Sequence, residues 1–163
     1  MATFGNTNAG SSTVAGPTAG DYCYGAKFTT PSNMGSVTSI SVSCVDNTAS
    51  KSFKAVIWDS SRAVVAIGSA VAFPNGKNWA TSNISASLSA STDYYIGLVW
   101  TSFASQQIVY ADNSGGNYYS GANNYTTPTT LPTTSSGTYN LSVYATYTPA
   151  SPTSTFIPQI IIS

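Results

Sequence analysis

The chain has 163 residues, a length typical of one compact domain, and only 6% of them are charged. With five basic residues, five acidic residues and no His, it lacks the usual general base, the commonest metal ligand and the positive charge that nucleic-acid binding needs. We therefore expect a protein that is not an enzyme, holds no cofactor and binds no nucleic acid. No run approaches the ~20 apolar residues of a membrane span, so we also expect that the chain crosses no membrane.

Apolar and polar residues alternate along the chain, and turn residues interrupt the alternation at short intervals. This pattern is typical of an all-β sandwich, and a chain without Glu is a poor helix former. The segments Lys51–Trp58 and Tyr94–Trp100 are apolar on both faces, so we expect them to be central strands. The expected strands are, in chain order, Ala2–Asn6, Asp21–Thr30, Ser36–Val45, Phe53–Asp59, Ala63–Gly68, Ala70–Phe73, Trp79–Ile84, Asp93–Thr101, Gln107–Ala111 and Thr138–Thr148.

The first residues carry neither the basic nor the apolar region of a secretory signal peptide. Two interpretations remain open. Either a signal has been removed and Met1 comes from an expression vector, or the protein leaves the cell without a signal, as virion proteins do at lysis. We favour the second, because Met1 and Ala2 run straight into the first expected strand.

The segment Ser36–Val45 shows the strand alternation clearly. Ile40 and Val42 lie on its apolar face, and we expect its other face, with Ser41 and Ser43, to meet solvent.

The two cysteines, Cys23 and Cys44, fall in two successive expected strands. One interpretation is a pair of buried thiols that pack as small apolar groups. The other is a disulfide between neighbouring strands, which stabilises a chain by about 3 kcal/mol in the chain-entropy model and needs an oxidising compartment. The sequence leaves both open, because it does not fix the Cα separation that the bond requires.

Each acidic residue lies at the end of an expected strand or in a turn, where Asp usually hydrogen-bonds the local backbone. Catalysis by a carboxyl pair or by an activated Ser or Cys is not indicated, since no His is present. Asp112, which precedes Asn-Ser-Gly-Gly, is the candidate calcium ligand, although calcium needs several converging oxygens. The five acidic residues are Asp21, Asp46, Asp59, Asp93 and Asp112.

The stretch from Asn113 to Thr138 is rich first in Gly, Asn and Tyr and then in Thr and Pro. Connections of this length are uncommon unless they bind something or are mobile. Tyrosines beside asparagines are suited to stack on a sugar ring and hydrogen-bond its hydroxyls; packing on the sheet or against another subunit is the alternative. The candidate carbohydrate-binding residues are Tyr118, Tyr119, Asn123, Asn124 and Tyr125.

The chain ends in a Pro/Ser/Thr linker followed by an apolar segment, residues 150–163 together. A free run of three isoleucines would be an aggregation hazard, so we expect the segment to be covered. It either packs on its own domain or inserts into a neighbouring subunit. The candidate assembly residues are Phe156, Ile157, Ile160, Ile161 and Ile162.

Several short motifs resemble one family of domains. These motifs are Thr3-Phe4-Gly5-Asn6-Thr7, Tyr24–Thr29, Gly35–Ile40, Lys54–Asp59, Leu88–Leu98 and Leu141–Thr148. Together they resemble jelly-roll domains of the carbohydrate-binding-module-like type, found in phage fibre and decoration proteins and on bacterial and archaeal surfaces. The resemblance implies a jelly-roll β-sandwich over residues 1–149, with two antiparallel sheets of eight to ten strands in all. Ser91 stands where the family usually has Gly, and no catalytic residues are implied.

From composition and resemblance together, we expect a structural subunit or decoration protein on the exterior of a virion, such as its capsid, or of another extracellular assembly. Its expected partners are copies of itself and other structural proteins, held partly by the apolar tail. The alternative is a lectin-like carbohydrate-binding surface domain whose partners are surface glycans.

Overall fold

The computed structural model describes residues 1–15, 20–46, 51–101, 107–112 and 115–151. Within these ranges the chain forms strands and no helix, which confirms the all-β prediction. The strands are β1 (Ala2–Gly5), β2 (Ser12–Ala15), β3 (Tyr22–Thr29), β4 (Ser36–Asp46), β5 (Ser52–Trp58), β6 (Val64–Ala72), β7 (Asn78–Ser87), β8 (Asp93–Trp100), β9 (Gln107–Asp112), β10 (Tyr118–Ala122), β11 (Ser135–Gly137), β12 (Asn140–Leu141) and β13 (Val143–Thr148).

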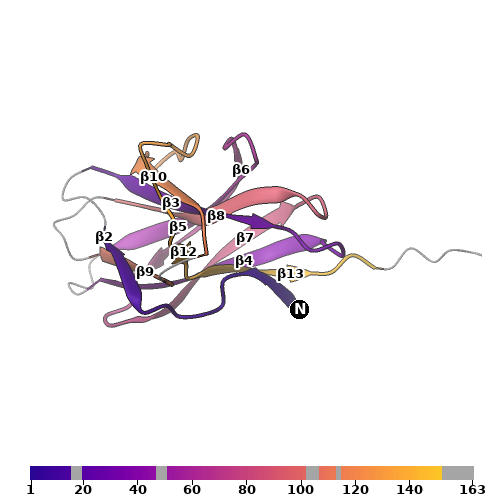
Figure 1. The fold of residues 1–163 in the computed structure, drawn as a ribbon, viewed down its shortest axis with the longest axis horizontal. Helices are drawn as coiled ribbons and strands as arrows, with labels where there is room; N and C mark the ends of the chain where they lie inside the picture. The colour runs from indigo at the N-terminus through magenta and orange to yellow at the C-terminus, as the bar shows by residue number, and fades with distance from the viewer. Residues whose placement is uncertain (16–19, 47–50, 102–106, 113–114, 152–163) are drawn as a thin grey trace, which may run out of the picture.

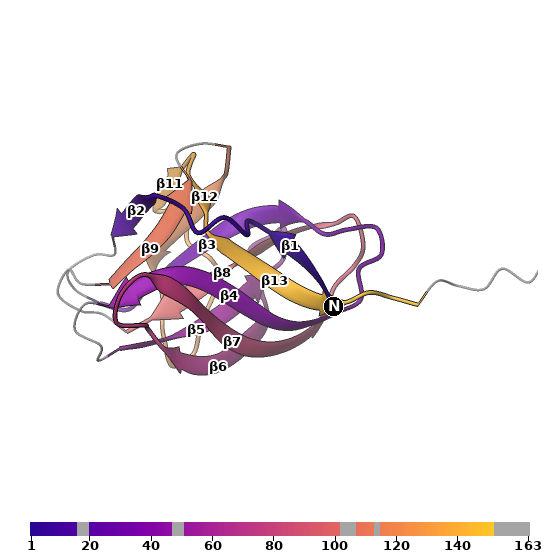
Figure 2. The same ribbon diagram turned by 90° about the horizontal axis from the view of Figure 1, so that it is seen from below.

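The strands form two antiparallel sheets that pack face to face (Figure 1). Sheet A has seven strands in the order β1-β13-β4-β9-β12, with β7 paired to β4 and β2 paired to β9. Sheet B has six, in the order β11-β10-β3-β8-β5-β6. Figure 2 shows β1, β13, β4 and β7 side by side. This order, facing β3-β8-β5-β6, is the jelly-roll arrangement of two interlocked four-stranded sheets.

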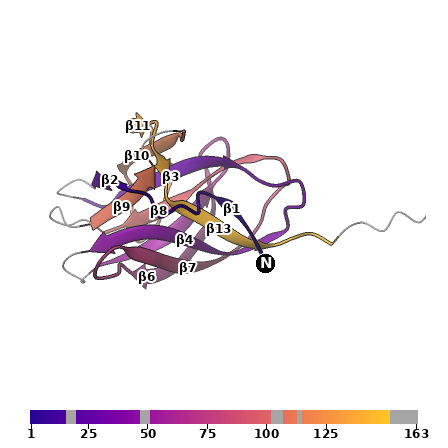
Figure 3. The same ribbon diagram turned by 60° about the horizontal axis from the view of Figure 1, so that its bottom comes forward.

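The remaining short strands widen the two sheets at one side (Figure 3). β10 pairs with β3 and carries β11 on its other edge, whereas β9 carries β2 and β12. Three of these strands, β2, β10 and β11, lie where we expected connections, so the strand number exceeds the expected eight to ten. The reason is that each is held by pairing with a distant part of the chain, which local sequence does not report.

The main core lies between the sheets. Ile40, Val42 and Cys44 of β4 are fully buried there, as the alternation predicted. Trp100 of β8 stacks on Tyr24 of β3 with ring centroids 5.5 Å apart. Burying a large apolar side chain contributes roughly 1.5–3 kcal/mol, so this layer is the main source of stability.

The opposite face of β4 departs from the prediction. Ser41 and Ser43 are buried rather than solvated. The Ser41 hydroxyl lies 2.8 Å from the Thr81 hydroxyl of β7, and the Ser43 hydroxyl donates to the Ala9 carbonyl at 3.0 Å. The segment between β1 and β2 therefore covers part of the outer face of sheet A, and hydrogen bonds replace the expected water.

A second apolar cluster covers the outer face of sheet B. It is formed by Cys23, Val56, Trp58, Tyr95, Val99 and Leu131. Leu131 comes from the connection between β10 and β11, which crosses the sheet here. Gly25 allows the close approach, because a Cβ at this position would lie 2.8 Å from the Leu131 side chain. This connection explains why the central strands β5 and β8 are apolar on both faces.

Candidate functional site

The aspartates act as hydrogen-bond acceptors, two of them for the local backbone. Asp59 accepts the Ala63 amide at 3.0 Å and holds the β5–β6 turn, and buried Asp46 accepts the Lys51 amide at 3.0 Å. Asp21 accepts the Tyr125 amide at 2.8 Å. The contacts of Asp59 and Asp46 agree with the expected role of Asp at strand ends, whereas Asp21 bonds a distant segment.

Asp112, the candidate calcium ligand, is bonded to amide donors. One of its oxygens accepts from the Asn6 side-chain amide at 2.9 Å and from that of Asn8 at 3.4 Å. The described residues contain no group of three or more His, Cys, Asp or Glu placed to hold a metal ion. Asp112 instead ties the segment after β1 to β9.

The two cysteines are free and buried, and they lie in two different apolar clusters. Cys44 belongs to the core between the sheets, whereas Cys23 belongs to the cluster on the outer face of sheet B. The disulfide, one of the two interpretations left open, is therefore not formed in this structure. Desolvation raises the pKa of each thiol to about 12, so both are protonated at neutral pH.

The candidate carbohydrate-binding tyrosines do not form one platform. Tyr118 and Tyr119 are neighbours on β10 and point to opposite faces. Tyr118 meets Tyr24 of the main core edge-on at 5.7 Å between ring centroids. Tyr119 packs on the outer cluster beside Tyr95, with their ring centroids 5.6 Å apart. Tyr125 also packs on that cluster.

The two asparagines of the same candidate set differ in burial and in the number of hydrogen bonds that they make. Asn123 is buried, and its side-chain oxygen accepts the amides of Asn124 and Thr129 at 2.8 and 2.9 Å. Its side-chain nitrogen donates to the Thr129 carbonyl at 3.3 Å. Asn124 is exposed and accepts the Thr127 amide at 2.9 Å. Asn123 therefore fixes the connection that carries Leu131.

The candidate assembly residues Phe156, Ile157, Ile160, Ile161 and Ile162 lie outside the described residues. The described chain continues from β13 to Ser151, where the Ala150 amide donates to the Asn33 carbonyl at 3.1 Å.

Strand β6, at the edge of sheet B, exposes two large apolar side chains. Val65 is 42% exposed and Ile67 is 43% exposed. The pairing with β5 shifts register between Ile57 and Trp58, which leaves Val65 without a partner in the ladder. We call Val65 and Ile67 the β6 patch. Sequence reasoning did not single it out, because the same valines and isoleucines would suit a covered strand.

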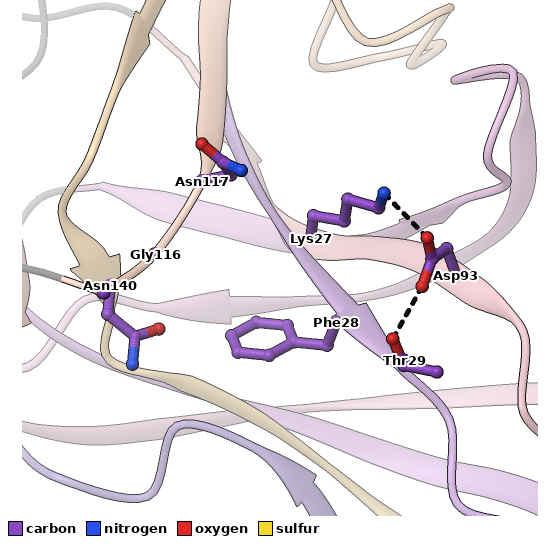
Figure 4. A pocket seen from close by; sticks show the side chains of 8 residues that line it. Lys27, Phe28, Thr29, Asp93, Gly116, Asn117 and Asn140 are labelled. Carbon is purple, nitrogen blue, oxygen red and sulfur yellow. Dashed lines mark hydrogen bonds and ion pairs between the residues drawn. The ribbon is translucent and has the colours of Figure 1, made fainter.

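A polar groove of about 640 Å³ runs along the end of β3 (Figure 4). Its residues come from four places in the chain: the end of β3, the start of β8, the connection before β10, and β12. The lining residues are Lys27, Phe28, Thr29, Asp93, Gly115, Gly116, Asn117 and Asn140.

Local backbone contacts build the groove wall. β10 stops pairing with β3 at Ala26, and the Lys27 amide then donates to the Asn117 carbonyl at 3.0 Å. The next glycine, Gly116, donates to the Thr138 carbonyl at 3.1 Å. A Cβ at Gly116 would lie only 2.4 Å from the Asn140 Cα. Glycine is therefore needed where this connection meets β12.

An ion pair lies on one side of the groove. The Lys27 Nζ is 2.7 Å from one oxygen of Asp93, and the Thr29 hydroxyl donates to the other at 2.6 Å. The hydrogen bond with Asp93 raises the pKa of Lys27, and the bonds from Lys27 and Thr29 lower the pKa of Asp93. Both side chains are more than one third exposed, so the pair contributes little to stability and stays accessible to a ligand.

Sequence reasoning missed this groove. Lys27 and Asp93 are far apart in the chain, and only the β3–β8 register, which pairs Thr29 with Asp93, brings them together. The glycines and asparagines before β10 were a usable signal, because they marked this connection as unusual.

Comparison with known proteins gives no relative: no family model, no curated protein and no solved structure matches the chain. Within the described ranges no helix has the length and apolar character to cross a membrane.

Proposed function

We propose that the protein is a non-enzymatic structural subunit or decoration protein on the exterior of a virion or other extracellular assembly. It self-associates when the apolar segment 156–162 of one copy docks on the β6 patch of another. The observation that carries the proposal is the β6 patch, two large apolar side chains on an edge strand of a domain with 6% charged residues. An edge strand also presents unpaired backbone groups that can pair with another chain.

The position of the patch supports this pairing. Val64, at the start of β6, pairs with Trp58 of β5, and Trp58 pairs with Tyr95 near the beginning of β8. The turn before β8 contacts the turn before β4 through the Ser91 amide and the Pro31 carbonyl, 3.4 Å apart, and Ala150 bonds to that same turn. The start of β6 and the exit of the chain therefore both lie toward the end of the sandwich where β8 begins, and Ile67 lies level with the middle of β8.

The composition of the linker is compatible with docking on a neighbouring copy. Pro and Thr favour an extended chain, and exchange of an identical segment between protomers is a low-cost route to assembly. The resemblance of the strand motifs to domains of phage fibres and cell surfaces supports an exterior location.

Cysteine cross-linking tests the proposal. Two variants, Ile67→Cys and Ile161→Cys, are mixed and oxidised mildly; the native thiols do not compete, because both are buried and protonated. We expect a covalent dimer that contains one chain of each variant. Ser85→Cys, on the exposed outer face of β7, replaces Ile67→Cys as the matched control and should give much less of this product.

Two results would contradict the proposal. One is the absence of the mixed dimer. The other is a double Ile67→Cys/Ile161→Cys variant that closes only within one chain, which would place the segment on its own domain.

A further inference from the structure

The connection between β6 and β7 contains the one Asn-Gly pair of the sequence, Asn75-Gly76. Gly76 has a φ of 100°, and a Cβ built on it would meet no heavy atom within 4 Å beyond its chain neighbours. Asn-Gly pairs are common in turns, because glycine adopts a positive φ at no steric cost. Both residues are exposed, so water reaches the pair directly.

The residues on either side of the pair are held in place. The Pro74 carbonyl accepts the amide of buried Asp46 at 3.0 Å. On the other side, the Lys77 ammonium lies 4.3 Å from the centre of the Tyr110 ring. Between these anchors, the carboxamide and the glycine amide of the pair form no hydrogen bond with any described residue. Both groups are therefore free to turn toward each other.

The other asparagines of the chain lack this combination, since none of them precedes a glycine. Asn83 is exposed, but it pairs with Ser39 in sheet A and precedes Ile84, whose branched Cβ hinders approach to the amide nitrogen. Asn123 is buried, and its carboxamide oxygen accepts the Thr129 amide at 2.9 Å. The turn between β6 and β7 is therefore the place where a reaction between side chain and backbone meets the least resistance.

We propose that Asn75 is a site of spontaneous deamidation. The amide nitrogen of Gly76 attacks the side-chain carbonyl carbon of Asn75, and the new C–N bond closes a succinimide ring. The bond from that carbon to the side-chain nitrogen breaks, and ammonia leaves with the proton of the Gly76 amide. Water then opens the ring at either carbonyl, which gives aspartate or isoaspartate. The reaction needs water alone as its co-reactant.

The modification changes the charge of a chain that is otherwise balanced. With five basic and five acidic residues at the start, one added carboxylate takes the formal net charge from zero to minus one. The new carboxylate lies two residues from Lys77, so it attracts the ammonium that packs on the Tyr110 ring. The proposal is separate from self-association and does not depend on it.

Ageing of the full chain in mildly alkaline buffer tests the proposal. Charge is followed by isoelectric focusing, and digests are analysed by mass spectrometry with separation of aspartate from isoaspartate. We expect a more acidic species, heavier by the difference between OH and NH₂, with the change mapped to Asn75 as both products. Asn75 should react at least about tenfold faster than Asn83 in the same sample, because only the free turn lets the reacting atoms meet.

Two comparisons separate the folded turn from the bare sequence motif. A peptide of residues 73–78 gives the rate without the fold, and the folded chain should react at a similar rate. Asn75→Gln keeps a carboxamide but lengthens the side chain, so the acidic species should form much more slowly. The proposal would be overturned if Asn75 stayed intact in the folded chain while the peptide reacted, or if the modification mapped to other asparagines.

Discussion

Ser91 adopts a backbone conformation that suits glycine. Its φ is 48°, in the turn before β8. The left-handed region costs a residue with a Cβ roughly 1–2 kcal/mol. The turn before β8 therefore carries strain that glycine would relieve.

We predict that Ser91→Gly raises the free energy of unfolding by about 0.5–1 kcal/mol, measured by urea denaturation. The gain is smaller than the strain, because Gly also adds freedom to the unfolded chain. Ala90→Gly is the control: Ala90 is not among the positive-φ residues, so the same change should lower stability. A loss of stability in Ser91→Gly would argue against strain at this turn.

The cysteine thiols give a second prediction at this scale. Because both are buried and protonated, a thiol reagent should label neither in the folded protein and both after denaturation. The unfolded chain loses its thiol protons near pH 9, whereas the folded chain keeps them to about pH 12. Stability should therefore fall as pH rises through this window. An intact mass two hydrogens lighter, with no labelling after denaturation, would show a disulfide instead.

Among the elements, the connection between β10 and β11 packs on the sandwich. It covers the outer face of sheet B with Leu131 and is held by Asn123. We predict that Leu131→Ala lowers the free energy of unfolding by about 2–5 kcal/mol, because it leaves a cavity over Trp58. Thr130→Ala, an exposed neighbour, should have a much smaller effect in the same urea titration. Equal effects would mean that the connection does not pack here.

The edge strand β6 gives the matching prediction for self-association. Ile67→Lys places a charge on the exposed patch, so we expect folding stability to change by less than about 0.5 kcal/mol. Association measured by light scattering should weaken strongly, since the charge would have to be desolvated. Ser85→Lys, on exposed β7, serves as control. Unchanged association in Ile67→Lys would remove the patch from the interface.

At the scale of the whole molecule, alternation in the sequence predicts the class and most of the strands, since one buried face imposes a period of two. Strands β3, β4, β5, β7 and β8 lie close to their expected ranges. β10 and the burial of Ser43 could not be predicted, because both depend on contacts with distant segments. For the same reason the groove of Lys27 and Asp93 appears only once the register is known. Sugar binding by the tyrosines stays a prediction.

The sizing of the full chain beside a chain that ends at Ser151 tests the assembly role most directly. Sedimentation velocity over a wide concentration range should show the full chain as a discrete oligomer and the truncated chain as a folded monomer, because only the first carries the apolar segment 156–162. A full chain that stays monomeric at every concentration, or a truncated chain that forms the same oligomer, would contradict self-association through that segment.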